Sequence, residues 1–338
     1  MRFFFSFCLA CLIWPLQATI ITVSNAPASA AAYSDLAQAI TAASAGDTLH
    51  VEGTGITYSG SNFVIDKRLV LIGPGRFPQG EFASGALVNG LRFQAGSDSS
   101  EVHGLYVNGT INTLSTVNHI VITGCYIEYG IDVNGGNWLI RDNIIRGGPF
   151  AVNPFALMNF AENATNLQIE NNVINGQCYK VRNGTFRNNI MTRVGQTFKG
   201  ACFNNVLENN IFYGPNALGC SNCTFNNNLT FGSSNDTIPY TGSTGTNNLI
   251  SQDPLFVNAP LSLNIFLYQS LDFHLQAGSP ALNAGTDSKD LGVFGGVSGT
   301  VSGNPPIPHI RSVSIDNATV PVGGNLHIKL ITTKPEGQ

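Results

Sequence analysis

The stretch that decides the fold lies mid-chain, where Ile169-Glu170-Asn171-Asn172-Val173 is followed 17 residues later by Phe186-Arg187-Asn188-Asn189-Ile190. The same unit recurs with paired Asn at 171–172, 188–189, 209–210, 227–228 and 247–248, and in weaker form at 142–143 and 124–125. With the second residue of each pair as position zero, the spacings are 18, 29, 17, 21, 18 and 20 residues. Repeats of this length predict a solenoid with one coil per copy.

Two apolar columns flank each Asn pair. Three residues before position zero stand Ile122, Ile140, Ile169, Phe186, Leu207 and Phe225. One residue after it stand Tyr126, Ile144, Val173, Ile190, Ile211, Leu229 and Leu249. Stacked coils place equivalent residues about 4.8 Å apart, so we expect both columns to face the interior.

The Asn pair itself is predicted to turn a corner of the coil. Asn tolerates the left-handed backbone region better than most residues, and stacked Asn side chains can hydrogen-bond along the column. Two residues before position zero the sequence has Arg141, Glu170, Arg187 and Glu208. We interpret this alternation as an outward electrostatic ladder with a structural role, in which each exposed pair contributes about 0–1 kcal/mol.

The front of the coil has the pattern of a short capping helix. Ser34 is expected to cap a helix that runs to about Ala43, and Gly46-Asp47 then turns into a strand. The segments Asp35-Leu36-Ala37-Gln38-Ala39-Ile40 and Ala43-Ser44-Ala45-Gly46-Asp47 resemble the opening of the pectin-lyase-like superfamily. The resemblance implies an all-β fold, a right-handed parallel β-helix with an N-terminal capping helix.

The far end also resembles secreted bacterial β-helix proteins. It carries Asp253-Pro254-Leu255-Phe256, Leu271-Asp272-Phe273-His274-Leu275, Ser279-Pro280-Ala281-Leu282-Asn283-Ala284-Gly285 and Asp290-Leu291-Gly292-Val293-Phe294-Gly295. We therefore assign residues 19–296 to the β-helix, 297–309 to a linker and 310–338 to a short C-terminal β segment. The resemblance concerns architecture more than chemistry.

The first 18 residues have the layout of a secretory signal peptide, with Arg2, an apolar run from Phe3 to Trp14 and a small residue at Ala18. We expect a protein that is secreted, either extracellular or at the cell surface, without a membrane span. A charged fraction of 11% and a net charge of −4 argue against nucleic acid as a partner. The sequence leaves the oligomeric state open.

The candidate chemistry lies in a stretch from Asn171 to Leu207 that has no acidic residue. Its cations outside the ladder are Lys180, Arg182, Arg193 and Lys199. Chondroitinase B and the alginate lyases, which this chain resembles in fold, use a Lys and an Arg near the scissile sugar. Lys180 with Arg182 or Arg193 can supply a base and a cation for proton abstraction beside a carboxylate. The motifs Gly-His-Gly and Arg-x-Lys of polygalacturonases, and Arg-x-Pro-x-x-Arg of pectate lyases, are missing.

The longest coil contains an insertion at about residues 150–163, which carries Phe150, Phe155 and Phe160. These rings either stack on sugars, beside Lys199, or cover an apolar side of the coil. Cys202 and Cys220 share a register position in adjacent coils, so a disulfide between them is geometrically feasible. Metal and cofactors are unknown from the sequence, and a calcium ion near Glu128 and Asp132 is left open.

Two hypotheses follow. The first is a polysaccharide-active protein, a lyase or hydrolase that acts on an acidic glycan. The second is a noncatalytic carbohydrate-binding, adhesive or structural surface module. The missing family motifs favour the second hypothesis, and the basic stretch beside an aromatic insertion favours the first.

Overall fold

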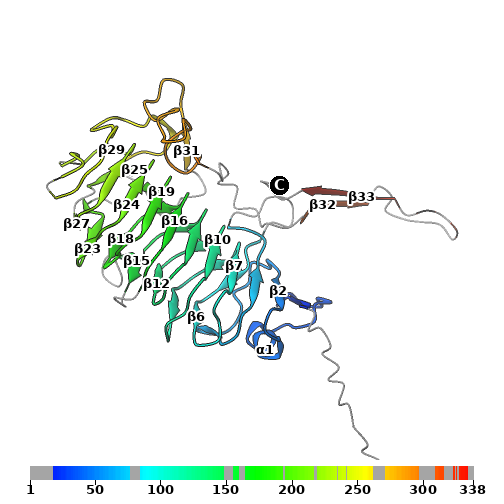
Figure 1. Cartoon of the computed structure of the whole chain (residues 1–338). Helices are drawn as coiled ribbons and strands as arrows, with labels where there is room; N and C mark the ends of the chain where they lie inside the picture. The colour runs from blue at the N-terminus through cyan, green and yellow to red at the C-terminus, as the bar shows by residue number, and fades with distance from the viewer. Residues whose placement is uncertain are drawn as a thin grey trace, which may run out of the picture.

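A computed structural model describes residues 18–76, 84–147, 155–159, 164–192, 195–216, 219–233, 235–240, 242–261, 271–296, 309–315, 323, 325 and 327–333. These residues form a parallel β-solenoid in which three sheets run along the coil axis. The rows of strands are visible in Figure 1, with α1 at the blue end. The solenoid predicted from the Asn repeat is confirmed. Its right-handed sense and its kinship with the pectin-lyase-like superfamily stay predictions.

Successive coils contribute short strands that stack in parallel within each sheet. Sheet A contains β1 (Ile20–Val23), β2 (Thr48–Val51), β4 (Val70–Ile72), β7 (Glu101–His103), β10 (Val121–Thr123), β13 (Leu139–Arg141), β16 (Gln168–Glu170), β19 (Thr185–Arg187), β24 (Val206–Glu208) and β28 (Thr224–Asn226). Sheet B contains β5 (Leu87–Val88), β8 (Tyr106–Val107), β11 (Tyr126–Ile127), β14 (Ile144–Ile145), β17 (Val173–Ile174), β20 (Ile190–Met191), β25 (Ile211–Tyr213) and β29 (Leu229–Phe231). Sheet C contains β3 (Phe63–Ile65), β6 (Leu91–Phe93), β9 (Ile111–Thr113), β12 (Ile131–Val133), β15 (Phe155–Asn159), β18 (Gln177–Tyr179) and β22 (Phe198–Lys199).

The Asn pairs form the corner between sheets A and B. The first residue of each pair adopts the left-handed conformation, with φ between 53° and 59° at Asp142, Asn171, Asn188, Asn209, Asn227 and Asn247. The second residue points into the coil. There Asn143, Asn172, Asn189, Asn210, Asn228 and Asn248 form a ladder, in which each amide nitrogen lies 2.9–3.1 Å from the next amide oxygen. Both the predicted corner and the predicted Asn ladder are confirmed.

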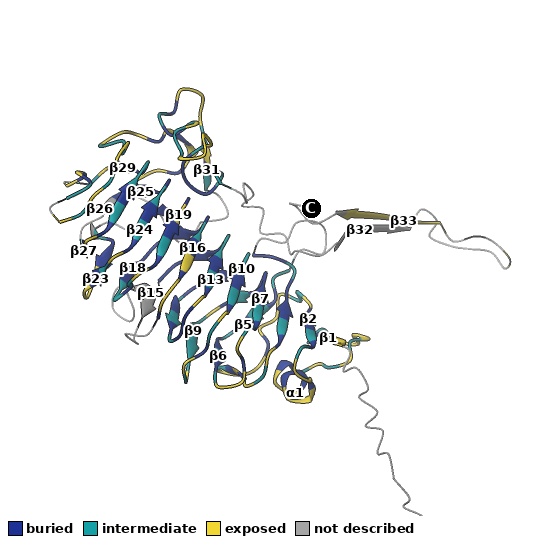
Figure 2. Cartoon of the chain, viewed as in Figure 1, coloured by how far each residue is buried: buried dark blue, intermediate teal, exposed yellow. Residues whose placement is uncertain are grey.

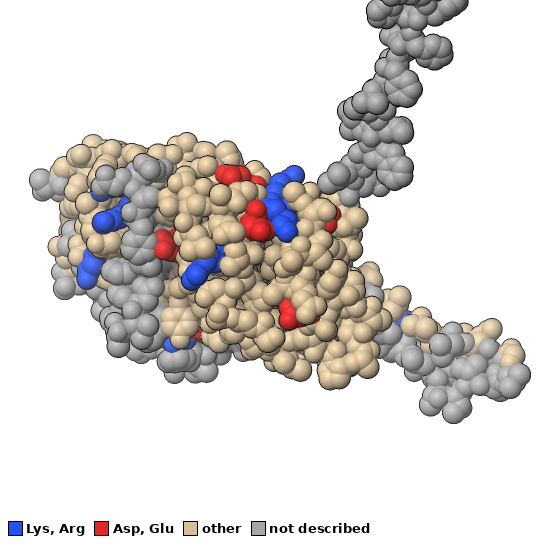
Figure 3. All heavy atoms as spheres, turned by 90° about the horizontal axis from the view of Figure 1, so that it is seen from below, with Lys and Arg blue, Asp and Glu red and all other residues tan. Residues whose placement is uncertain are grey.

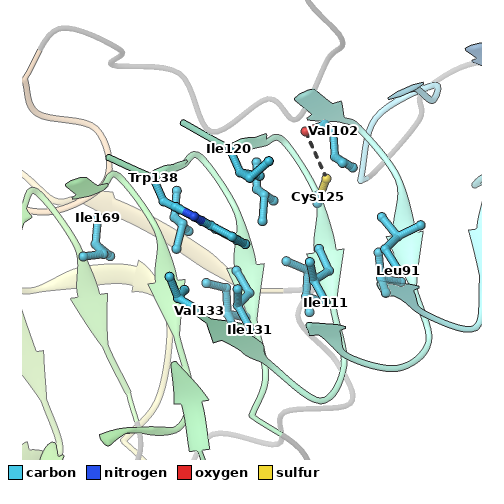
Figure 4. Close-up of a cluster of buried hydrophobic side chains, with 14 of the residues drawn as sticks. Leu91, Val102, Ile111, Ile120, Cys125, Ile131, Val133, Trp138 and Ile169 are labelled. Atoms are coloured by element: carbon cyan, nitrogen blue, oxygen red, sulfur yellow. Dashed lines mark hydrogen bonds between the residues drawn. The ribbon is translucent and has the colours of Figure 1, made fainter. Parts of the chain in front are cut away.

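The coil interior is a continuous apolar core. It takes in the predicted column at position minus three, from Ile122 to Phe225. Figure 4 shows how side chains from successive strands, such as Leu91, Ile111 and Ile131, point into one interior. The buried Trp138 packs there with its indole nitrogen donating to Val117 O at 2.8 Å.

The second apolar column faces the other way, which corrects our expectation. Tyr126, Ile144, Val173, Ile190, Ile211 and Leu229 belong to a separate cluster with Phe256, Phe273, Leu291 and Val293. The reason is alternation along the strand: the inward Asn at position zero forces the next residue outward. Residues 253–261 and 271–296 supply the side chains that cover this column, so the column is buried outside the coil.

A short helix packs on the first strands of the solenoid. Helix α1 (Leu36–Ala42) buries Leu36, Ala39 and Ile40 and leaves an exposed outer side, drawn yellow in Figure 2. Its N-cap is Asp35, whose carboxylate accepts from Gln38 N at 3.0 Å, so the predicted Ser34 cap was wrong by one residue.

Four further strand pairs of the described residues lie outside sheets A, B and C. β30 (Phe256–Asn258) pairs antiparallel with β31 (Asp272–Leu275), and β32 (His309–Ile315) pairs antiparallel with β33 (Ile328–Thr333). Parallel pairs form between β21 (Gly195–Gln196) and β26 (Pro215–Asn216), and between β23 (Cys202–Phe203) and β27 (Cys220–Ser221). Among the described residues, no helix has the length and apolar character needed to cross a membrane.

Candidate functional site

The structure brings three of the predicted cations together on two adjacent coils. Lys199 of β22 is the register partner of Tyr179 of β18, and the backbone N–H of Lys180 donates to Lys199 O at 2.9 Å. Lys180 has φ 56°, so the chain turns there as it leaves sheet C. Arg182 follows and bridges to Phe203 on the next coil. We call Tyr179, Lys180, Arg182, Lys199 and Phe203 the basic corner.

Two of these cations lie over aromatic rings. Lys180 Nζ is 5.6 Å from the ring centroid of Tyr179, and the Arg182 guanidinium carbon is 4.7 Å from that of Phe203. Arg182 Nε also donates to Ala201 O at 3.4 Å. Such contacts hold long basic side chains along the ring faces. The basic corner therefore presents cations and aromatic edges side by side.

The basic corner stands out because charge is sparse elsewhere. Charged residues make up 11% of the chain, and the face seen in Figure 3 is mostly uncharged, with scattered basic and acidic side chains. The sequence from Asn171 to Leu207 contributes no carboxylate. Three cations on two coils are therefore a local concentration of positive charge.

The other predicted substrate residues are only partly placed. Arg193, Phe150 and Phe160 lie outside the described residues. Phe155 is the first residue of β15, whose backbone joins sheet C between β12 and β18. The inserted segment thus supplies one extended strand beside the coil that carries the basic corner.

The predicted disulfide between Cys202 and Cys220 was wrong, although the register behind it is confirmed. The two residues are partners in β23 and β27, yet Cys220 is bonded to Cys223, whose Cα lies 6.1 Å away. Cys202 stays a free, buried thiol that faces Lys199 O at 3.1 Å and Cys178 O at 3.5 Å. Its sulfur thus contacts a carbonyl of its own coil and one of the preceding coil.

Glu128 and Asp132 have separate environments. Glu128 is buried, accepts from the Tyr106 hydroxyl at 2.9 Å and forms an ion pair with Arg146. Asp132 lies on the outer side of β12, and its Oδ1 atom is buried with no hydrogen-bond partner. Burial raises the pKa of the Asp132 carboxyl to about 7. In the described part of the chain, no group of three or more His, Cys, Asp and Glu is arranged to hold a metal ion.

The structure also shows a groove that sequence reasoning missed. Its floor is the charge ladder on the outer face of sheet A, where Arg187 lies 3.4 Å from Glu170 and 3.0 Å from Glu208. The ladder prediction is confirmed for these three residues. Arg141 instead lies 3.6 Å from its neighbour Asp142.

The groove has a volume of about 280 Å3, and its second wall comes from residues that follow the repeat. Thr286, Asp287 and Gly296 line that wall, opposite Arg141 and Arg187. Asn188 also lines the groove, and its buried amide nitrogen has no acceptor. The spacing of the repeat could not reveal this wall, because it is built from residues about one hundred positions later in the chain.

Comparisons with known proteins assign the chain to no family. No protein-family model matches it, and no curated protein sequence matches it. Among solved structures seven chains match, including "Geobacillus virus E2 - ORF18", with a TM-score of 0.30 and 13% sequence identity over 63% of this chain. The match covers 55% of that viral chain, so this chain spans about half its length.

Proposed function

We propose that this protein binds an acidic polysaccharide along the basic corner. The observation that carries the proposal is the pair of cation–aromatic contacts on adjacent coils, in a stretch that contributes no carboxylate. Ammonium and guanidinium groups bind carboxylates through charge-assisted hydrogen bonds. The Tyr179 and Phe203 rings add apolar area against which the faces of sugar rings can pack.

The solenoid favours a polymeric ligand over a small one. Lys180 and Lys199 are in adjacent coils, so a chain lying along the axis meets one cation per coil. Contacts that repeat along a polymer act together and raise its effective affinity. The ligand class is therefore an acidic glycan such as alginate, pectate or chondroitin.

The test is a binding measurement on the whole protein with these three polymers, with and without calcium. The double variant Lys180→Ala/Lys199→Ala is expected to bind about tenfold more weakly, equivalent to about 1.4 kcal/mol. Lys329→Ala is the matched control, since Lys329 is an exposed cation on β33 and is expected to bind as the wild type does. Equal affinity of the double variant and the control would contradict the proposal.

Catalysis is the finer part of this proposal. Lys180 as base, with Arg182 or Arg193 as the stabilising cation, would cleave a uronate chain by elimination. Ultraviolet absorbance of the unsaturated product measures this directly. A rise that is lost in Lys180→Ala supports a lyase, whereas polymer binding without any product supports the noncatalytic carbohydrate-binding module.

The same proposal places the protein outside the cell. Its support is the signal-like pattern of residues 1–18. Expression with these residues is expected to export a protein whose first residue is Thr19. Retention of the full-length chain inside the cell would contradict the assignment.

A further inference from the structure

Three side chains on the outer face of sheet A form a continuous hydrogen-bonded series. Nδ1 of His103 lies 2.7 Å from the Thr123 hydroxyl oxygen, and Nε2 of His103 lies 2.9 Å from a carboxylate oxygen of Glu101. Glu101 and His103 are the ends of β7, and Thr123 is the register partner of His103 in β10. The alternation of the strands turns all three outward, because Val102 and Ile122 between them face the core.

The series has the order nucleophile, base and orienting carboxylate. A carboxylate only accepts hydrogen bonds, so Nε2–H of His103 donates to Glu101, and Nδ1 then accepts from the Thr123 hydroxyl. A hydroxyl, an imidazole and a carboxylate in this order define an activated nucleophile on many unrelated folds. The His103 side chain is only 10% exposed, so its ring is held in place.

A cation stands next to the hydroxyl. Arg141 is the register partner of Thr123 in the following strand, β13. Its Nε atom is buried without a hydrogen-bond acceptor and forms a long ion pair with Asp142 Oδ2 at 3.6 Å. An unsatisfied guanidinium N–H beside a nucleophile is suited to negative charge that develops on an attacked carbonyl oxygen.

The groove begins at the same arginine. From Arg141 it runs along the ladder past Glu170 and Arg187, with Asn188 and Thr286 at its sides. Its volume of about 280 Å3 is near the lower end of ordinary ligand sites. Its carboxylates accept hydrogen bonds and its arginines and Asn188 amide donate them, a combination that suits a molecule rich in hydroxyl groups.

We propose that Thr123, His103 and Glu101 form an ester-hydrolysing site that removes a small acyl group from a hydroxyl-rich molecule, such as an acetylated sugar, held in the groove. This activity goes beyond the proposed glycan binding and uses none of its residues. Sheet A carries the site, whereas the basic corner lies at the end of sheet C.

The reaction balances with water as the only co-reactant. The Thr123 oxygen bonds to the acyl carbon while its proton passes to Nδ1 of His103, and the carbonyl electron pair moves onto the oxygen beside Arg141. The bond to the sugar oxygen then breaks, and the sugar hydroxyl leaves with the proton from His103. Water gives its proton to His103 and attacks the acyl-Thr123, which releases a carboxylic acid and restores the hydroxyl.

The experiment measures hydrolysis of p-nitrophenyl acetate and release of acetate from acetylated xylan by the whole protein. The wild type is expected to hydrolyse both esters. Thr123→Val keeps the branched shape and is expected to lose activity about a hundredfold or more, as is His103→Ala. Thr123→Ser is expected to keep turnover, and Thr185→Ala, on the same sheet, serves as a matched control with wild-type rates.

Mass spectrometry of the quenched reaction supplies a second readout. The wild type is expected to carry one acetyl group on the peptide that contains Thr123, and Thr123→Val is expected to carry none. Wild-type turnover by Thr123→Val, or a wild-type protein that hydrolyses neither ester, would overturn the proposal. Neither result depends on whether the basic corner binds an acidic polysaccharide.

Discussion

The two Asn residues of each pair are chemically identical neighbours, yet they have opposite surroundings. Asn172 points inward, donates to Ile140 O at 2.8 Å and Asn189 Oδ1 at 3.0 Å, and is completely buried. Asn171 points outward and donates to Val293 O at 3.0 Å and Gly295 O at 2.9 Å. Asn172 is satisfied by the adjacent coils, and Asn171 by residues that follow the repeat.

The difference teaches that the same sequence signal carries two structural roles. The inner Asn column stabilises the stacking of the coils, since each side-chain amide hydrogen-bonds to the Asn of the adjacent coil. The outer Asn column holds residues 284–295 against the solenoid, through Asn171, Asn209 and Asn227. We therefore expect substitutions in the inner column to affect global stability and those in the outer column to act locally.

The largest effect is expected for Asn189→Ala. The change leaves the Asn172 backbone N–H and the Ile169 carbonyl without their side-chain partner inside the core. Each buried unpaired group costs about 1–3 kcal/mol, so we expect a loss of about 3–5 kcal/mol in the free energy of unfolding. Urea titration measures it, with the exposed Asn235→Ala as control within about 0.5 kcal/mol. A loss below about 1 kcal/mol would remove the distinction between the two columns.

A smaller and local effect is expected for Asn171→Gly. Glycine keeps the left-handed conformation but removes the amide that holds Val293 and Gly295. We expect a loss of about 2 kcal/mol and faster tryptic cleavage after Lys289. Unchanged cleavage together with a full-size global loss would show that the outer column acts as the inner one does.

Asp132→Asn tests an outward polar group that has no partner. Its pKa is raised from 3.8 to about 7 by burial. Between these two pH values the unfolded chain has lost the proton while the native chain keeps it, so the stability of the wild type falls as pH rises through this window. Because the carboxyl is partly exposed, we expect a decline of about 1 kcal/mol, absent in the variant. Urea midpoints at pH 4 and pH 8 measure this decline. Equal pH dependence of stability in the wild type and in Asp132→Asn would contradict the burial of the Asp132 carboxyl.

The smallest effect is expected for Arg187→Met. The Arg187 side chain is 44% exposed and its ion pairs with Glu170 and Glu208 compete with water and salt. We expect a loss of about 0.5 kcal/mol or less that vanishes at high salt. A loss comparable to that of Asn189→Ala would place the charge ladder on a level with the inner Asn column.

Local regularity explains what the sequence could predict. The column from Ile122 to Phe225, the corner at each Asn pair and the register of Cys202 with Cys220 all follow from residues one coil apart. The outward column at Ile144 was misjudged because the inward orientation of the Asn at position zero was not anticipated, and its covering partners, Leu291 and Val293, come from residues outside the repeat. Non-local contacts of this kind leave no periodic signal in the sequence.

The candidate sites divide in the same way. Lys180, Arg182 and Lys199 were singled out because they fall in a stretch without acidic residues, and in the structure they lie on two adjacent coils. The groove needs a wall from Thr286 to Gly296 and was missed. The alignment of Thr123 with His103 could have been predicted from the sequence. When the ladder register is extended toward the N-terminus, His103, Thr123 and Arg141 fall in one column.

The packing of residues 253–261 and 271–296 on sheet B also sets an order of events during synthesis. The coils are made from the N-terminus and can stack as they emerge, but the apolar outer face of sheet B has no cover until Phe273, Leu291 and Val293 have been added. The apolar outer column of sheet B therefore stays exposed to water until residue 293 has been synthesised. A truncated chain that ends before residue 253 keeps that column exposed permanently, which makes self-association its expected fate.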